Sequence, residues 1–264
     1  MLRNSRKIFV INLDTSISRM RESQNQLWNF DFERVSAIDG SKLDHDALTR
    51  FYDAELNYQQ YHSVLTPGEI GCYLSHRKVW QKIVNENLDF ALVLEDDFIN
   101  NAALSKLMHD VAQIEQLWDC IKLAEFPIKR KVVFSERLGN TNLEIYNKIP
   151  AKTCAQIISL VGAKKLLAMS EKFGRPVDID IQHWWESDLR VFGLKPYPFE
   201  INQNMDSDIE NKGSRKKLKR RRIFKLCKQL LFYFRNKQHT TILLSKKQLS
   251  FRRNSYKPLK TMIR

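Results

Sequence analysis

The sequence predicts an α/β domain with a mostly parallel central sheet, followed by a basic helical C-terminal tail, and three observations support this prediction. Short apolar segments alternate with helical segments from residue 7 to about residue 200, as in a sheet whose strands are joined by helices. Residues 90–94 (FALVL) are apolar at every position, which is typical of a strand buried on both faces. The charge is unevenly distributed and separates the tail from the rest of the chain.

Strands are expected where short segments are rich in apolar or β-branched residues. These segments are residues 7–13, 32–38, 90–94, 120–126, 153–160 and 176–180. Helices are expected over residues 18–30, 67–87, 163–173 and 183–193. If residues 176–180 form a strand, Asp178 and Asp180 lie on the same side of it.

The clearest helix start is the sequence Thr66-Pro67-Gly68-Glu69. Thr66 can cap the helix, Pro67 suits the first helical position, and Glu69 can bond back to the cap. His76 lies at the centre of the apolar face of this helix. It is either a buried core residue or a group that hydrogen-bonds and orients an acid of the acidic cluster described below.

The charge pattern divides the chain into an acidic body and a basic tail. Residues 212–264 contain 19 Lys and Arg and no acid, whereas residues 1–211 contain 25 basic and 30 acidic residues. The apolar part of the tail, IFKLCKQLLFYF, is interrupted by a polar sector of Lys225, Lys228 and Gln229. We therefore expect a catalytic domain over residues 1–211 and a basic amphipathic tail that lies on an anionic membrane surface.

Several classes of protein do not fit the composition. The four cysteines lack metal-ligand or disulfide-framework spacing, which favours a reducing compartment. The sequence contains no run of about 18 apolar residues, so it does not predict a membrane-spanning helix. The glycine-rich phosphate-binding motifs of dinucleotide-binding proteins and P-loop enzymes do not occur.

An acidic cluster, Glu95-Asp96-Asp97, directly follows the strand expected at residues 90–94. It therefore lies at the carboxyl edge of the sheet, where open α/β sheets bind ligands. Adjacent carboxylates repel one another, and a divalent cation such as Mg²⁺ or Mn²⁺ relieves this repulsion through oxygen ligands. Such a cation neutralises the charge on a departing diphosphate. The alternative is a solvated acidic turn without a ligand.

Six stretches, in the same order as in the family, resemble glycosyltransferase family 25, the lipooligosaccharide galactosyltransferases. They are IFVINLDTSISRM, SAIDG, LTPGEIGCYLSHRKVW, ALVLEDDF, ISLVGAKKLL and PVDID. The resemblance implies a GT-A-like nucleotide-sugar-binding fold and inverting transfer of a hexose from a UDP-sugar. UDP-galactose is the expected donor, with glucose as the alternative sugar, and a lipooligosaccharide is the expected acceptor.

The resemblance also implies Mn²⁺ or Mg²⁺ at the acidic cluster, although the spacing there departs from the usual Asp-x-Asp. Asp97 is the preferred direct ligand, with Glu95 or Asp96 as its partner. Glu95 and Asp96 also count among the residues expected to bind the donor. His183, Trp184 and Trp185 are expected either to line the acceptor site or to pack in the core. His183 is also a candidate for a further metal ligand.

Five other residues have expected roles at the site. Asn12 is expected to contact the uracil, with the alternative that it pairs backbone groups in the turn. Arg19 is expected to contact the diphosphate or the uracil, with the alternative of an exposed helix arginine. An inverting transfer needs a base near the acceptor hydroxyl. Asp178 is the first candidate, followed by Asp180 and Glu186, and for either aspartate the alternative is a helix cap.

We therefore expect a cytoplasmic glycosyltransferase that associates peripherally with the inner face of the bacterial inner membrane. Two other classes compete with this interpretation. A single-strand nucleic-acid binder would use the aromatic and basic residues of the tail, but the acidic body opposes it, and we expect no nucleic-acid partner. A metal-dependent phosphohydrolase would also use clustered acids, but it would need a nucleophilic aspartate or a second metal cluster.

Overall fold

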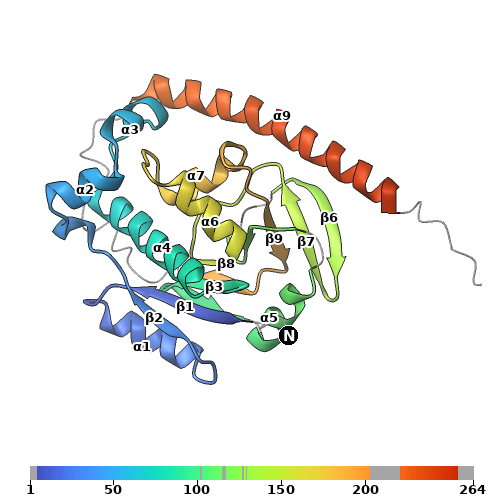
Figure 1. Cartoon of the computed structure of the whole chain (residues 1–264), viewed down its shortest axis with the longest axis horizontal. Helices are drawn as coiled ribbons and strands as arrows, with labels where there is room; N and C mark the ends of the chain where they lie inside the picture. Colours follow the sequence, from blue (N-terminus) through green and yellow to red (C-terminus); the bar gives the residue numbers. More distant parts are fainter. Residues whose placement is uncertain are drawn as a thin grey trace, which may run out of the picture.

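The computed structural model describes residues 5–101, 103–114, 117–126, 128, 130–202 and 221–254, with side chains described up to residue 245. Its centre is an eight-stranded sheet in the order β2-β1-β3-β8-β5-β9-β7-β6 (Figure 1). The strands are β1 (Arg6–Asn12), β2 (Glu33–Ser36), β3 (Phe90–Glu95), β5 (Cys120–Lys122), β6 (Val132–Leu138), β7 (Thr141–Tyr146), β8 (Ala155–Ser159) and β9 (Val191–Lys195). A separate antiparallel pair consists of β4 (Phe98–Asn100) and β10 (Phe199–Ile201).

The strand directions confirm the α/β class and the largely parallel sheet. Strands β2, β1, β3, β5, β9 and β6 run in one direction, and β8 and β7 run in the opposite direction. Strand β8 lies between β3 and β5, and its first residue, Ala155, pairs with Leu94 near the end of β3. This antiparallel pairing brings the residues that precede Ala155 next to the acidic cluster.

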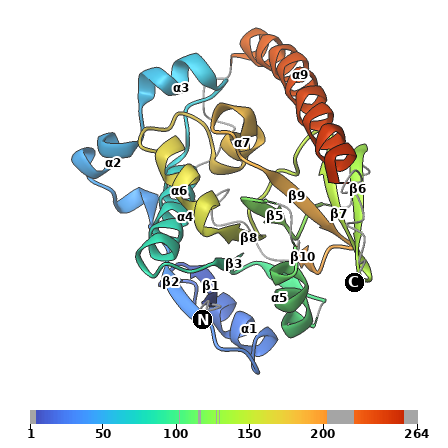
Figure 2. The ribbon, with the colours of Figure 1, turned by 45° about the vertical axis from the view of Figure 1, so that its right-hand side comes forward.

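Helices cover both faces of the sheet (Figure 2). They are α1 (Ile17–Gln26), α2 (His45–Phe51), α3 (Ala54–Gln60), α4 (Pro67–Asn85), α5 (Leu104–Ala112), α6 (Leu160–Met169) and α7 (Val177–Gln182), with short 3-10 turns η1 (Gly40–Lys42) and η2 (Trp184–Glu186). Successive residues of β1 face opposite layers. Phe9 and Ile11 pack in the core that contains α4, α6 and α7, whereas Ile8 and Val10 pack in the core that contains α1 and α5.

The start of α4 has the predicted capping box. The Thr66 hydroxyl accepts a hydrogen bond from the Glu69 backbone N–H at 3.1 Å, and Glu69 Oε2 accepts one from the Thr66 N–H at 2.8 Å. A side chain at Gly71 would meet the carbonyl oxygen of Ile38 at 2.4 Å. The first turns of α4 therefore lie directly against the chain that leaves β2, which positions the helix over the end of β3.

Two predictions of secondary structure are wrong. Residues 177–180 belong to the helix α7, and residues 176–180 do not form a strand. Pro176 precedes the helix, and Asp178 and Asp180 lie in its first turn, where acids stabilise the helix dipole. Val177 and Ile181, four residues apart, are both buried in the core shared with α4. This helical burial overrides the β-branched composition that suggested a strand.

The helix expected over residues 183–193 is also wrong. The segment forms the 3-10 turn η2 and then the strand β9. Asp188 has a φ of 50°, which interrupts helical geometry, and β9 pairs with β5 on one side and with β7 on the other. The helix expected over residues 18–30 is present but shorter, since α1 ends at Gln26.

Part of the basic tail forms the long helix α9 (Arg222–Asn254), which extends from α3, past α7, to β6 (Figures 1 and 2). Residues 212–220 of the tail lie outside the described residues. The polar sector of α9 that includes Lys228 and Asn236 faces the body, because the Asn236 side chain bonds to Trp184 and to the Asn147 carbonyl. None of the helices in the described part of the chain has the length and apolar character to cross a bilayer.

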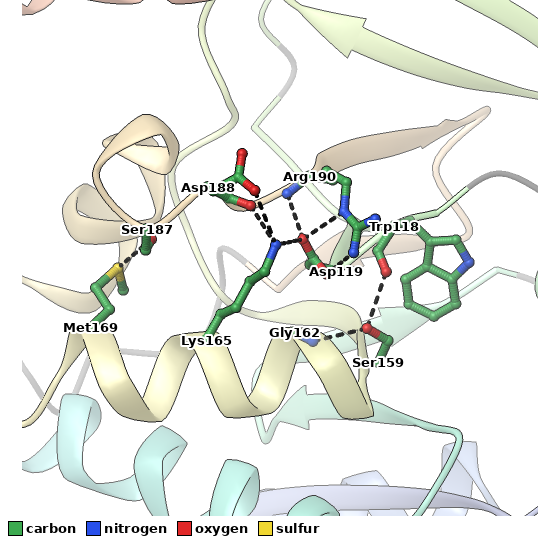
Figure 3. Close-up of polar contacts among 9 residues, drawn as sticks. All are labelled: Trp118, Asp119, Ser159, Gly162, Lys165, Met169, Ser187, Asp188 and Arg190. Atoms are coloured by element: carbon green, nitrogen blue, oxygen red, sulfur yellow. Dashed lines mark hydrogen bonds and ion pairs between the residues drawn. The ribbon is translucent and has the colours of Figure 1, made fainter. Parts of the chain in front are cut away.

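A buried carboxylate, Asp119, connects three elements at the amino-terminal ends of the parallel strands, which is the side of the sheet opposite the acidic cluster (Figure 3). Asp119 precedes β5 and is fully buried. It accepts hydrogen bonds from Arg190 Nη2 at 2.6 Å, Arg190 Nε at 2.9 Å and Lys165 Nζ at 2.9 Å. Burial favours the neutral acid, but these bonds outweigh burial and lower the pKa of Asp119. The carboxylate thus joins β5, β9 and α6.

We predict that Asp119→Asn lowers the free energy of unfolding by about 2 kcal/mol at pH 7, because it removes the buried charge partner of Arg190 and Lys165, whose side chains are each about a quarter exposed. Since the pKa of Asp119 is lowered in the folded state, this contribution is present at neutral pH and is lost as the pH falls through the folded pKa. Urea denaturation at pH 7 and pH 3 measures both effects. Asp188→Asn is the control, because that side chain is 97% exposed, and an equal loss in both variants would contradict the prediction.

Candidate functional site

The three acids at the end of β3 lie in different environments. Asp96 is the one whose two carboxylate oxygens are both bonded to side chains of the protein. Its Oδ2 accepts a hydrogen bond from Asn12 Nδ2 at 2.6 Å, and its Oδ1 accepts one from Arg19 Nη1 at 3.1 Å. The register that places Ile11 opposite Glu95 also brings Asn12, at the end of β1, beside Asp96. Burial still raises the pKa of Asp96. With both oxygens bonded inside the protein, Asp96 fits the cation-ligand role less well than its neighbours.

Asn12 and Arg19 therefore lie at the predicted site, but both hold Asp96. Asn12 is buried, its Nδ2 also donates to the Ser16 carbonyl at 3.0 Å, and its Oδ1 accepts from Arg34 Nε at 2.9 Å. With these groups bonded, Asn12 is a positioning residue for the acidic cluster. The Arg19 side chain is 17% exposed, so part of its guanidinium can also contact a bound ligand.

Glu95 is oriented by His76 and Thr153. Glu95 Oε1 and His76 Nε2 lie 2.9 Å apart in a hydrogen bond, and the Thr153 hydroxyl donates to the same oxygen. Burial favours the neutral acid, but the bonds from His76 and Thr153 outweigh it and lower the pKa of Glu95. His76 is fully buried. Both interpretations of His76 thus hold, since this core residue also orients an acid of the cluster.

Asp97 is the acid with unused bonding capacity. Its Oδ1 is buried and has no hydrogen-bond partner among the described residues. Burial is the largest cause that raises the pKa of Asp97 to about 6, and the charge of Glu95 adds to it, while the Cys154 thiol hydrogen-bonds the carboxylate and opposes the rise. The positive charge of Lys152 also opposes the rise, but no Lys or Arg in the described part of the chain forms an ion pair with Asp97.

Asp178 lies within electrostatic range of the same cluster. The pKa of the Cys72 thiol is raised well above its usual value, first by burial and then by the charges of Glu95, Asp178 and Asp97. Asp178 Oδ1 accepts a hydrogen bond from the Ile179 N–H at 2.9 Å, and the side chain is only partly buried. The fold thus brings the first candidate base toward the acids at the end of β3, although 83 residues separate Glu95 from Asp178.

The structure gives Asp180 and Glu186 a different role from that of a base. Asp180 is 3% exposed and bonds to the Tyr73 hydroxyl at 2.9 Å and to Arg175 Nε at 2.5 Å. Glu186 forms an ion pair with Arg175 Nη2 at 2.5 Å. Burial raises the pKa of Asp180 to about 6. Both acids bond to Arg175 and join α7 to α4 and to the turn η2. Asp180 is buried and is therefore not available as the base, whereas the Glu186 side chain is 35% exposed but is held in an ion pair, which favours Asp178 over it.

His183 does not join the acidic cluster. Its Nδ1 lies 2.8 Å from the carbonyl oxygen of Ile179, and its ring packs against Trp185 and Phe232. Burial, followed by the charge of Arg175, lowers the pKa of His183 to about 4. The assignment of His183 as a metal ligand is therefore corrected to a packing role between α7 and α9.

Sequence reasoning missed the residues that β8 and the loop before it contribute. Thr153 and Cys154 contact Glu95 and Asp97, and the Glu95 N–H donates to the Cys154 carbonyl at 2.8 Å. Lys122 on β5 is also fully buried and donates to the carbonyl oxygen of Lys152 at 2.8 Å. A parallel β8 would have placed these residues at the opposite sheet edge. The available signal was a hydroxyl and a thiol directly before an apolar strand.

The residues at this site fit a divalent cation. Asp97 offers a buried carboxylate oxygen without a partner, and Glu95 keeps its Oε2 for a second contact while Oε1 bonds to His76. Oxygen ligands of this type suit Mg²⁺ or Mn²⁺. Cys72, His76 and Glu95 also place ligand atoms within 4.8 Å of one another. The raised pKa of the Cys72 thiol makes the thiolate a poor ligand, so the carboxylates remain the favoured donors.

We predict that Asp97→Asn stabilises the cation-free protein by about 2 kcal/mol at pH 7.5 and has a much smaller effect at pH 4. The pKa of about 6 lies above the unfolded value of 3.8, so the folded state loses stability as the pH rises between these values. The neutral amide removes that loss. Urea denaturation with a chelator, at both pH values, measures it, with the exposed Asp31→Asn as the control. A stabilisation that does not depend on pH would contradict the assigned cause.

Comparisons with known proteins were made for the chain and for its fold. A rat protein described as a probable inactive glycosyltransferase 25 family member 3 is 31% identical over 215 residues, covering 72% of this chain and 37% of the relative. Procollagen galactosyltransferase 1-B of Xenopus laevis is 30% identical over 214 residues, covering 72% and 35%. The chain thus spans just over a third of the length of these curated relatives.

Among solved structures, a glycosyltransferase involved in glycosylation of the major capsid of PBCV-1 aligns with a TM-score of 0.43 and 8% identity, covering 76% of this chain and 94% of that one. A Drosophila β-1,4-galactosyltransferase 7, in complex with manganese, UDP-Gal and xylobiose, aligns with a TM-score of 0.39 and 8% identity, covering 81% and 76%. The sequence model of glycosyltransferase family 25 (LPS biosynthesis protein) matches residues 5–181. The chain therefore belongs to glycosyltransferase family 25.

Proposed function

We propose that the chain transfers a hexose, galactose in the first instance and glucose as the alternative, from a UDP-sugar to a lipooligosaccharide acceptor. The observation that carries the proposal is the buried, unpartnered carboxylate oxygen of Asp97, held beside Glu95 at the carboxyl end of β3. The unpartnered oxygen of Asp97 would bind a divalent cation that in turn binds the diphosphate of the donor. Asp178, whose charge reaches Cys72 beside the same cluster, is the residue that we propose to act on the acceptor.

The chain's own residues divide the work of donor binding. Asp97 and Glu95 would hold Mn²⁺ or Mg²⁺, which when bound neutralises the charge that develops on the departing diphosphate. Asp96 fixes the orientation of this segment through Asn12 and Arg19. The exposed part of Arg19 supplies a further positive group for a phosphate oxygen.

Asp178 would act as the base of an inverting transfer. It accepts the proton of the acceptor hydroxyl while that oxygen attacks the anomeric carbon from the side opposite the diphosphate. Its partial exposure leaves carboxylate oxygen capacity for the hydroxyl. Asp180, two residues later, cannot replace it, because Asp180 is engaged by Arg175 and Tyr73.

We predict that transfer of radiolabelled galactose from UDP-galactose, with Mn²⁺ and a lipooligosaccharide acceptor, falls by about a hundredfold or more in both Asp97→Asn and Asp178→Asn. The two losses differ in kind. Asp97→Asn also weakens Mn²⁺ binding, measured by electron paramagnetic resonance, whereas Asp178→Asn leaves it unchanged. A parallel donor screen with UDP-glucose decides between the two sugars.

Asp31→Asn, an exposed acid on the loop before β2, serves as the activity control. Wild-type rates in Asp97→Asn would refute the role of the cation. Absence of transfer from any UDP-sugar by the wild-type chain would place it with the relatives described as inactive. Release of inorganic phosphate from simple esters instead of transfer would favour a phosphohydrolase.

The outward face of α9 supports peripheral association with the cytoplasmic face of the inner membrane. The side of this helix that carries Lys228, Phe232 and Asn236 faces the body. Other apolar residues face outward: Ile223 is 79% exposed, Leu226 and Leu230 are each 61% exposed, and Phe234 is 64% exposed. These side chains recur at the spacing of one helix face. An exposed apolar stripe on a basic helix fits the interface of an anionic bilayer.

We predict that the double variant Leu226→Glu/Leu230→Glu binds phosphatidylglycerol-containing vesicles at least about tenfold more weakly than the wild type, because two leucines no longer enter the interface. Co-sedimentation at physiological salt measures this. Val64→Glu/Leu117→Glu is the matched control, since both side chains are exposed on the body. An equal loss in the control, or salt-sensitive binding to single-stranded DNA without vesicle binding, would contradict the membrane assignment.

A further inference from the structure

A cavity of about 910 Å³ lies between α9 and the body, away from the acidic cluster. Its walls come from α7, from the turn η2, from the β6–β7 hairpin and its flanking residues, and from the body-facing side of α9. Its volume lies within the range of pockets that hold small ligands, roughly 300 to 1,000 Å³. The function proposed above does not use this cavity.

The cavity is strongly basic. Lys225, Lys228, Arg235 and Lys237 line it from α9, and Lys131, Lys148 and Arg175 line it from the body. Among the described residues that line the cavity, Glu186 is the only Asp or Glu, and this acid is paired with Arg175. In the part of the chain that the structure describes, no carboxylate forms an ion pair with Lys131, Lys225, Lys228 or Lys237. The excess positive charge therefore favours an anion with several charges.

Aromatic rings and an unused donor complete the lining. Phe232 and Trp185 lie with their ring centroids 5.3 Å apart, and Trp185 stacks on His239 at 5.6 Å with an interplanar angle of 6°. Trp185 Nε1 is buried without a hydrogen-bond partner in the described part of the chain. Aromatic faces suit the C–H surface of a sugar, and an unpaired indole N–H suits an oxygen acceptor.

The wall formed by α9 is held in place. The Asn236 side chain is buried, accepts a hydrogen bond from Trp184 Nε1 at 3.1 Å and donates to the Asn147 carbonyl. At the start of the helix, the Arg221 backbone N–H donates to the His62 carbonyl at 3.1 Å. The cavity is thus a built feature between two anchored points of α9.

The helix α7 connects this cavity to the candidate base. The cavity is lined by three residues on or just after α7, namely Ile179, Gln182 and His183. On the same helix, the charge of Asp178 raises the pKa of the Cys72 thiol, which lies beside the acidic cluster. A helix of six residues is only about 9 Å long. The charge of Asp178 also acts to raise the pKa of Lys148 in the cavity wall, although burial lowers it overall. The cavity and Asp178 therefore share one short helix, α7.

We propose that this cavity binds the phosphate groups of a phosphorylated saccharide, and that it selects a phosphorylated acceptor for the transfer. The lysines of α9 would bind the phosphate oxygens, Trp185 would pack on a sugar ring, and the unphosphorylated end would extend toward Asp178. This inference rests on the proposed function for the direction of the acceptor, but its binding step can be measured without transfer.

The test uses calorimetric titration of the full chain, saturated with UDP, with a disaccharide that carries two phosphate monoesters. Lys225→Ala/Lys228→Ala is expected to weaken binding by about tenfold or more, because two charge-assisted hydrogen bonds are removed. Lys42→Ala/Lys164→Ala removes the same charge from exposed positions outside the cavity and should retain wild-type affinity. Trp185→Phe should weaken binding while it keeps an aromatic ring.

The dephosphorylated disaccharide is expected to bind far more weakly. Equal affinity for the two disaccharides, or equal losses in the two lysine variants, would overturn the inference. Loss of anionic vesicle binding in Lys225→Ala/Lys228→Ala without loss of disaccharide binding would also overturn it, because the lysines would then serve a phospholipid headgroup. A third outcome separates this inference from the proposed function. If the chain transfers galactose to a phosphate-free acceptor but does not bind the phosphorylated disaccharide, this inference is refuted and the proposed function remains intact.

Discussion

The hydrogen bonds of Asp96 to Asn12 and Arg19 are the interaction on which the candidate site depends. They join the ends of β1 and β3 to α1 and give one acid of the cluster its positive and polar partners. With Asp96 turned inward and paired, Glu95 is oriented by His76, and Asp97 is left with a buried, unpartnered oxygen. Three consecutive carboxylates thus acquire three different roles, which bulk solvent would not allow.

This arrangement places a destabilising group at a defined position. The raised pKa of Asp97 means that its ionised form opposes folding, whereas the paired Asp119 at the other sheet edge has a lowered pKa and supports folding. Charged groups with unfavourable burial are commonly found at functional sites, because a bound cation or substrate compensates their charge. The raised pKa of Asp97, together with its unpartnered oxygen, supports the carboxyl end of β3 as the candidate site.

The orientation of α9 relates the tail to the body. Its side with Lys228, Phe232 and Asn236 closes a basic cavity against α7 and the β6–β7 hairpin, and Ile223, Leu226, Leu230 and Phe234 remain exposed on another side. In our proposals, the exposed apolar side would meet a membrane and the cavity side would bind an anionic ligand. The helix α7 lines this cavity and also carries Asp178.

The sequence by itself determined the features that depend on near neighbours: the capping box at Thr66, the buried strand over residues 90–94, the acidic cluster after it and the charge of the tail. Tertiary structure alone decided that Asp178 lies on a helix, that β8 runs antiparallel and brings Thr153 to Glu95, and that Asp97 keeps a free oxygen. Capping and helical periodicity act over about four residues, so the local sequence specifies them. Strand direction, burial and the pairing of a charge depend on residues that lie far apart in the chain and meet only when it folds.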